Sequence, residues 1–261
     1  MTQESVRWEQ RGHIGIITLN RPNERNALNL ATLERFGELL ELARMEQKEV
    51  RVVLIKAEGT AFCAGADLKE RRTMSEQQVR QHVKKIRDVF AAVARLSQPT
   101  IAMINGYALG GGFELALACD FRYAVEEAQM GLTEVSLGII PGAGGTQRLS
   151  RLIGPSRAKE LILTARRISA QDAYALGIVN GVAKDADELE QRALSLADEI
   201  LANAPLAVYQ AKAAIDRGAS VDLQTGLDLE AMSYEVIIPT KDRVEALEAF
   251  REKRKPVFRG E

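Results

Sequence analysis

Two glutamates lie in stretches of the sequence that are otherwise uncharged. Glu114 is the one charged residue between Leu96 and Cys119, and Glu134 precedes the 13 uncharged residues VSLGIIPGAGGTQ. Apolar surroundings raise the pKa of a carboxyl group, and a pair of such groups suits general acid and general base catalysis. The same pattern also fits a Glu134 that caps a local turn and a Glu114 that bonds buried backbone groups. The spacing alone leaves both interpretations open.

Small-residue loops accompany these carboxylates. GYALGGG contains Gly111 and AGAD contains Ala66, and each loop precedes a predicted helix. Free N–H groups at the start of a helix can hold a developing oxyanion, and glycine leaves room for a ligand beside the backbone. Two such donors that converge on one carbonyl oxygen would form an oxyanion hole. Tight turns that serve packing alone remain the alternative.

The scarcity of histidine and cysteine excludes several reaction classes. His13 opens the apolar run HIGIITLN and His82 lies beside Lys84 in a helical run, so both are predicted to be turn or surface residues. A Ser-His-Asp or Cys-His site would need one of them. The sequence has no H-E-x-x-H, no G-x-S-x-G and no phosphate-binding loop, and its glycines do not fit G-x-G-x-x-G. We therefore expect neither a metal site nor a nicotinamide site.

The charge balance and the cysteine content bear on partners and compartment. Lys plus Arg number 35 and Asp plus Glu 36, which argues against nucleic acid as the main partner. The basic runs KERR (69–72), VKKIR (83–87) and EKRK (252–255) are predicted to be solvated faces. Cys63 and Cys119 form no C-x-x-C pair, and the first residues MTQESVRWEQ have no apolar signal region, so a cytoplasmic protein is expected. The uncharged run 96–113 contains a proline and four glycines and is predicted to be a buried strand and turn, not a membrane span.

Strand-like and helix-like segments alternate along most of the chain, which indicates an α/β fold. Strands are predicted at VRWEQ, HIGIITLN, RVVLIKA, PTIAMIN, DFRYAV and AQMG. Helices are predicted at 30–45, from Ser75 with a capping box to Gln78, and at FELALAC. After about Val182 only helical patterns follow. AFCAGAD and GYALGGG are predicted to be loops.

Several motifs in one order resemble the enoyl-CoA hydratase/isomerase (crotonase) superfamily. They are HIGIITLNRPNERNALN, GTAFCAGADLKE, ALGGGFELALACD, GLTEVSLGIIPGAGGTQRL, ARRISAQDAYALGIVNGV and TKDRVEALEAFREKRKPVF. Within the superfamily the chain is most similar to the methylglutaconyl-CoA hydratase (AU-binding homologue) branch. The resemblance implies a spiral of ββα turns over residues 1–195 and a helical oligomerisation region over 196–261. It also implies a homo-oligomer, a trimer or a dimer of trimers.

The resemblance assigns roles to the residues singled out above. The thioester oxygen would lie between the N–H groups of Ala66 and Gly111. Glu114 would act as base toward the water, and Glu134 would protonate the α-carbon. Gly142 matches a backbone position near the water.

Further positions match coenzyme A contacts of the family. They are Arg25, Ala27, Leu28, Ala64, Asp67, Leu68, Lys69 and, for the coenzyme A of a neighbouring subunit, Lys241 and Phe258. Coenzyme A would be part of the substrate, and no separate cofactor is implied.

The implied activity is addition of water to a 2-enoyl-CoA, either 3-methylglutaconyl-CoA or a short straight-chain thioester. A Δ3-Δ2 enoyl-CoA isomerase is the alternative enzyme, because isomerases share the fold, although they commonly lack one of the glutamates. RNA binding, associated with the AU-binding homologue, is disfavoured because the matching segment 29–50 carries five glutamates against three basic residues.

Overall fold

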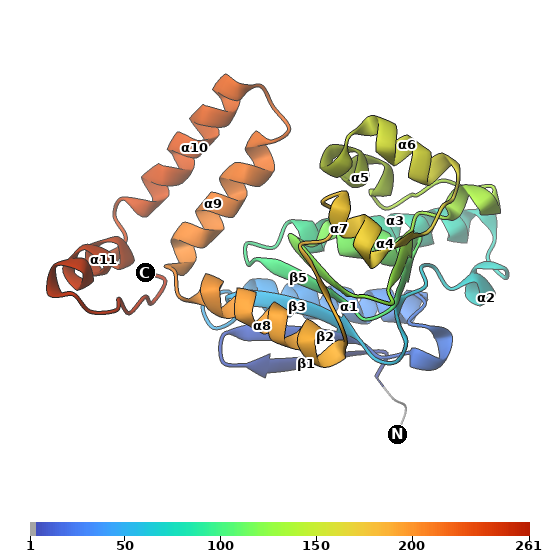
Figure 1. The fold of residues 1–261 in the computed structure, drawn as a ribbon, viewed down its shortest axis with the longest axis horizontal. Coiled ribbons are helices and arrows are strands. Elements are labelled where there is room, and N and C mark those ends of the chain that lie inside the picture. Colours follow the sequence, from blue (N-terminus) through green and yellow to red (C-terminus); the bar gives the residue numbers. More distant parts are fainter. Residues whose placement is uncertain (1–3) are drawn as a thin grey trace.

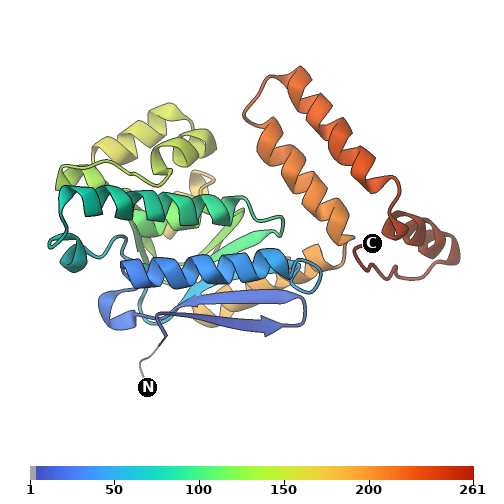
Figure 2. The same ribbon diagram turned by 180° about the vertical axis from the view of Figure 1, so that it is seen from behind.

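The computed structural model describes residues 4–261. The chain begins with an antiparallel hairpin of β1 (Val6–Arg11) and β2 (Ile14–Leu19), as predicted. All six residues of β2 are buried, because the strand lies inside a six-stranded sheet whose two faces are both covered. Helix α1 (Leu30–Met45) crosses the face seen in Figure 2, and α8 (Ala186–Leu201) crosses the face seen in Figure 1. The predicted α/β class is confirmed.

Two sheets run side by side through the core. In the first, β3 (Val52–Ala57), β5 (Thr100–Ile104), β7 (Phe121–Val125) and β10 (Gly181–Ala183) follow β2 in parallel. The second has the order β4 (Ala61–Cys63), β6 (Tyr107–Leu109), β8 (Gln129–Gly131) and β9 (Ile168–Ser169). The passes β3–β4, β5–β6 and β7–β8 each give one strand to each sheet and then enter a helix, which is the predicted spiral of ββα turns.

Strands β4 and β6 lie in segments that were predicted to be loops, and that prediction was wrong. Each strand is only three residues long, AFC in β4 and YAL in β6. Neither segment is long enough to show the alternation of apolar and polar residues by which a strand is recognised in a sequence. Their pairing in parallel fixes the positions of the two loops that follow them, AGAD and GGG.

His82 lies on helix α3 (Glu76–Ala94), and the prediction that it is a turn or surface residue was wrong. The helix begins with the expected capping box between Ser75 and Gln78. His82 is 2% exposed, because it shares the inward face with Ile86 and Val89 at helical spacing. Burial lowers its pKa, so the ring is neutral at pH 7. His13 is only half-buried at the hairpin turn, with Nδ1 2.7 Å from the carbonyl oxygen of Glu49.

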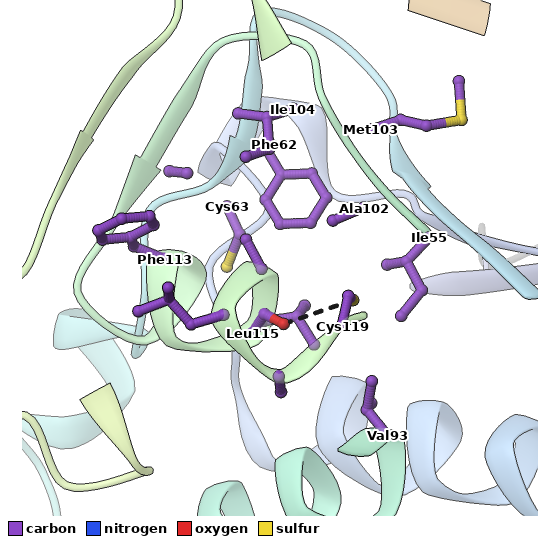
Figure 3. Packing of buried hydrophobic residues seen from close by; sticks show 14 of the residues in the cluster. Ile55, Phe62, Cys63, Val93, Ala102, Met103, Ile104, Phe113, Leu115 and Cys119 are labelled. Carbon is purple, nitrogen blue, oxygen red and sulfur yellow. Dashed lines mark hydrogen bonds between the residues drawn. The ribbon is translucent and has the colours of Figure 1, made fainter. Parts of the chain in front are cut away.

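Helix α4 (Gly111–Ala118) is embedded in the centre of the molecule and carries Glu114. Its Phe113 and Leu115 belong to the hydrophobic core together with Phe62 and both cysteines (Figure 3). Burial raises the pKa of the Cys63 and Cys119 thiols to about 12, so neither is a nucleophile at neutral pH. At the end of α4 the buried guanidinium of Arg122 donates to the carbonyl oxygens of residues 116 and 119. A cation at the negative end of the helix stabilises α4 in place.

The remaining α-helices are, in chain order, α2 (Leu68–Arg71), α5 (Gly145–Ile153), α6 (Pro155–Leu163), α7 (Ala170–Ala175), α9 (Pro205–Gly218), α10 (Leu223–Ile237) and α11 (Lys241–Glu252). Helices α9 and α10 form a hairpin that projects from the core, and α11 lies beside its base (Figures 1 and 2). The predicted division at 195/196 falls within α8 and stays a prediction. No helix in residues 4–261 is long and apolar enough to cross a membrane.

Candidate active site

A cavity of about 550 Å³ opens beside the N-terminus of α4. One wall is the AGAD loop with α2 and α3, the floor is the start of α4, and the opposite wall is the segment 133–143. The residues that line it are Ala64, Gly65, Ala66, Leu68, Arg71, Val83, Ile86, Arg87, Gly110, Gly111, Glu114, Thr133, Glu134, Leu137, Ile139, Ile140, Gly142 and Ala143. The four residues predicted to be catalytic therefore share one cavity, although they are spread over nearly 70 positions of sequence.

The two predicted oxyanion donors lie close together. A Cβ atom built on Gly111 would lie 3.7 Å from the backbone nitrogen of Ala66. Hydrogen bonds of the residues before and after Ala66 fix its position beside Leu28. Leu28 N donates to Gly65 O at 2.8 Å, and Asp67 N donates to Leu28 O at 3.1 Å. Within residues 4–261 neither the Ala66 N–H nor the Gly111 N–H has an acceptor. Two free, preorganised donors beside a cavity can stabilise an oxyanion.

Glycines make this approach of the two loops possible. Gly65 has φ +91° and Gly110 has φ +53°, both in the left-handed region that favours glycine. A Cβ atom on Gly65 would lie 2.9 Å from the carbonyl oxygen of Leu109 and 3.1 Å from the nitrogen of Gly111. A larger residue there would push the loops apart.

Glu114 is 3% exposed and is held by the backbone of the opposite wall. Its Oε1 accepts hydrogen bonds from the N–H groups of Ala143 and Gly145, both at 2.8 Å. Burial raises the pKa of Glu114, while these two N–H groups and the charge of Arg148 oppose the rise. A carboxylate that accepts two N–H bonds is stabilised as the anion. Glu114 is thus equipped to act as a base with its other oxygen.

Glu134 has the opposite environment at the start of a short 3-10 helix, η2 (Glu134–Leu137). Both of its carboxyl oxygens are buried, and in the described part of the chain neither has a hydrogen-bond partner. Burial and the nearby negative charge of Glu114 raise the pKa of Glu134 to about 7. A carboxyl group with a pKa of about 7 is about half protonated at neutral pH and can serve as a general acid.

The residues predicted to contact coenzyme A from the two central loops lie together. Ala64 N donates to Arg25 O at 3.0 Å, and Leu28 pairs with Ala66 as an isolated parallel bridge, which places 25–28 against 64–67. Ala27 lies within that contact, and Ala64 and Leu68 line the cavity, whereas Lys69 is exposed. The carboxylate of Asp67 makes contacts within the protein: it caps α2 and accepts a hydrogen bond from Arg21 Nη2 at 3.1 Å.

The other predicted contacts fall in two places. Gly142 lines the cavity, as expected for a backbone position near the reacting water. Lys241 and Phe258 do not line it, and α11 lies at the far end of the molecule from α2 (Figure 1). Only a neighbouring subunit could bring these two residues to an active site.

Three arginines near the glutamates were missed by sequence reasoning. Arg71 and Arg87, in the runs KERR and VKKIR that were predicted to be solvated faces, line the cavity; Arg71 is half-buried and Arg87 is exposed. Arg87 lies one turn after the cavity residue Val83 on α3, and this helical spacing is the signal that could have shown it. Arg148 donates from Nη1 to Ala143 O at 2.9 Å, behind the loop that holds Glu114. No local pattern in the sequence marks that contact.

Comparison with known proteins agrees with this architecture. The family model for enoyl-CoA hydratase/isomerase matches residues 9–261. Human enoyl-CoA hydratase domain-containing protein 2, mitochondrial, is 50% identical over 249 residues, which cover 94% of this chain and 85% of that protein. Human methylglutaconyl-CoA hydratase, mitochondrial, is 48% identical over 257 residues, with 97% and 75% covered. The crystal structure of enoyl-CoA hydratase from Bacillus anthracis is similar with a TM-score of 0.96 at 52% identity, over 98% of this chain and 100% of that one. The chain belongs to the enoyl-CoA hydratase/isomerase family.

Proposed function

We propose that the protein is a 2-enoyl-CoA hydratase. The observation that carries the proposal is the contrast between the two buried carboxyl groups beside two free N–H donors. The pKa of Glu114 is raised by burial, but two N–H donors and the charge of Arg148 oppose that rise; the pKa of Glu134, whose oxygens have no partner among residues 4–261, is raised to about 7. Hydration of an enoyl thioester needs one base, one acid and stabilisation of an enolate oxygen, and these groups supply all three.

The reaction follows from these positions. Glu114 removes a proton from water while the water oxygen bonds to the β-carbon of the enoyl group. The electron pair of the double bond moves toward the thioester carbonyl, and its oxygen gains negative charge between the N–H groups of Ala66 and Gly111. Glu134 then gives its proton to the α-carbon, which yields the 3-hydroxyacyl-CoA. Proton exchange with solvent restores both carboxyl groups, and no cofactor besides the coenzyme A of the substrate takes part.

A Δ3-Δ2 isomerase is the second candidate, because moving a double bond also passes through an enolate. One base that carries a proton between two carbons suffices for that reaction, whereas this cavity holds two carboxyl groups that differ in their hydrogen-bond partners. The test is a panel of 2-enoyl-CoA and 3-enoyl-CoA thioesters compared by kcat/KM. Faster turnover of a 3-enoyl-CoA than of every 2-enoyl-CoA would overturn the hydratase assignment.

For the acyl group we propose a chain that ends in a carboxylate, with 3-methylglutaconyl-CoA as the preferred substrate. Arg71 and Arg87 line the cavity, and neither forms an ion pair with any residue from 4 to 261. Two cations without a carboxylate partner favour an anionic ligand group between them. The proposal predicts higher kcat/KM for 3-methylglutaconyl-CoA than for crotonyl-CoA, and loss of that preference in Arg71→Met and Arg87→Met. Arg72→Met, exposed and outside the cavity lining, is the control.

We also propose a homo-oligomer, a trimer or a dimer of trimers. Helices α10 and α11 expose large apolar side chains, among them Leu223 at 79%, Met232 at 67% and Phe250 at 86%. Apolar surface of this extent on two adjacent helices favours a protein partner, and a second copy would also bring Lys241 and Phe258 toward a neighbouring cavity. Light scattering after size exclusion tests the assembly, and a monomer at micromolar concentration would contradict it.

RNA binding is not part of the proposal. On α1 the arginines are paired with glutamates of the same helix, Arg35 with Glu38 at 3.0 Å and Arg44 with Glu41 at 2.6 Å. Filter binding of AU-rich RNA with a steep salt dependence would contradict this expectation. The cytoplasmic location stays a prediction, and two of the relatives named above are mitochondrial.

A further inference from the structure

Arg148 lies behind the active-site wall and outside the cavity lining. It belongs to the first half of α5, four residues after the glycine that precedes this helix, and its side chain turns back toward the helix start. Nη1 donates to the carbonyl oxygen of Ala143 at 2.9 Å, and within residues 4–261 the side chain has no carboxylate partner. A half-buried guanidinium committed to one carbonyl is unusual enough to require a reason.

The reason lies in the turn that Arg148 holds. Residues 143–145 present two N–H groups in one direction, and both bond the same atom, Oε1 of Glu114. Gly144, between them, has φ +110°, and a Cβ atom there would lie 2.2 Å from Nη1 of Arg148. The guanidinium thus packs directly on the turn, and glycine at 144 is needed for this contact.

We propose that Arg148 is a positioning residue for Glu114: by bonding Ala143 O and packing on Gly144, it holds the turn whose N–H groups fix the catalytic carboxylate. This inference rests on the proposed function and extends it to a residue that does not touch the substrate. Burial raises the pKa of Glu114, and the two N–H groups and the charge of Arg148 oppose that rise. Arg148 therefore supports both the orientation and the ionised form of the base.

Three variants separate this role from a general effect on folding. Arg148→Met removes the charge and the donor, and Arg148→Lys keeps the charge and one donor group. Arg151→Met, on the exposed side of the same helix, is the matched control. With a good 2-enoyl-CoA substrate, Arg148→Met is expected to lower kcat about 10- to 100-fold while KM changes little, since misplacement of a catalytic group by about 1 Å costs up to about 100-fold.

The pH profile gives the decisive readout. Loss of Arg148 lets Glu114 take up a proton at higher pH, so the acid limb of kcat moves to higher pH in Arg148→Met and returns toward the wild-type position in Arg148→Lys. The control keeps the wild-type profile. An unshifted acid limb in Arg148→Met would overturn the proposal, whether or not kcat falls. If the Met variant does not fold, Arg148→Gln, which keeps a donor and loses the charge, must show the acid limb at higher pH than the wild type, and an unshifted limb there would overturn the proposal.

A measurement without substrate keeps this inference separate from the proposed function. Infrared difference spectra follow the protonation of Glu114 with pH, assigned by the band that Glu114→Gln removes. The band is expected to titrate at higher pH in Arg148→Met than in the wild type, even if the wild-type protein turned over no 2-enoyl-CoA. An unchanged titration would overturn the positioning role and leave the hydratase proposal standing.

Discussion

Glu114 and Glu134 share one cavity and differ in their hydrogen bonds to the protein. Oε1 of Glu114 accepts two backbone N–H groups at 2.8 Å, whereas both buried oxygens of Glu134 have no partner among residues 4–261. N–H donors stabilise a carboxylate, and burial without donors destabilises it. In the proposed function this difference makes Glu114 the base and Glu134 the acid. The charge of the first also raises the pKa of the second.

This division predicts a bell-shaped dependence of kcat on pH. The alkaline limb follows deprotonation of Glu134 at a pKa of about 7, and the acid limb follows protonation of Glu114, whose pKa lies above its ordinary value of 4.5. Glu134→Gln is expected to lower kcat by about 10²- to 10⁴-fold and to abolish the alkaline limb, because the acid is gone. Glu114→Gln should lower kcat by a similar factor and abolish the acid limb. Rates from pH 5 to 9 at saturating substrate measure both effects, and wild-type rates in both variants would contradict the assigned roles.

The same shift predicts how stability changes with pH. The pKa of Glu134 is about 7 in the folded protein and 4.5 ordinarily, so between these values the folded state holds a proton that the unfolded chain has released. The contribution of Glu134 to stability therefore falls as pH rises from 4.5 to 7 and is constant above. Relative to the wild type, Glu134→Gln should gain about 3 kcal/mol of unfolding free energy between pH 4.5 and pH 8. Urea unfolding at both pH values and fixed protein concentration gives this difference. If the difference in unfolding free energy between the variant and the wild type is the same at both pH values, the pKa of Glu134 is not raised by folding.

A partly buried ion pair joins the projecting hairpin to the core. Lys212 Nζ on α9 lies 2.5 Å from Oδ2 of Asp120, which also accepts from the backbone and hydroxyl of Thr100. Removing one member of a buried pair leaves the other charge without compensation. Lys212→Met is expected to lower the unfolding free energy by about 2–4 kcal/mol. The double variant Lys212→Met/Asp120→Asn should recover part of the loss, and no recovery would show that the two side chains are not coupled.

The sequence was enough to single out the two glutamates that line the cavity, but not the arginines around them. Glu114 and Glu134 could be predicted because an isolated charge in a long uncharged run is a local feature, and Ala66 and Gly111 followed from the family motifs. His82 was misplaced because the lysines beside it suggested a surface, while its helical spacing with Ile86 decided its burial. Arg71 and Arg148 were missed because their roles depend on contacts across the fold.

The two adjacent glycines at the start of α4 should respond to alanine in opposite ways. A Cβ atom on Gly111 would lie no closer than 3.6 Å to any neighbouring atom, whereas one on Gly112 would lie 2.0 Å from the carbonyl oxygen of Cys63. Gly111→Ala should therefore fold with stability within about 1 kcal/mol of the wild type. Its methyl group would stand beside Ala66 N, where the thioester oxygen must bind, and kcat should fall about 10²- to 10³-fold, the cost of one lost oxyanion donor.

Gly112→Ala is the matched comparison, because the added methyl group is the same and only its surroundings differ. It must displace the backbone of β4, so it should lose at least about 1–3 kcal/mol of stability, as overpacked cores do. Thermal unfolding and kcat, measured on both variants, separate the two outcomes. Full activity in Gly111→Ala would show that the thioester oxygen does not bind between Gly111 and Ala66, because a methyl group placed 3.7 Å from that nitrogen leaves no room for the oxygen between the two loops.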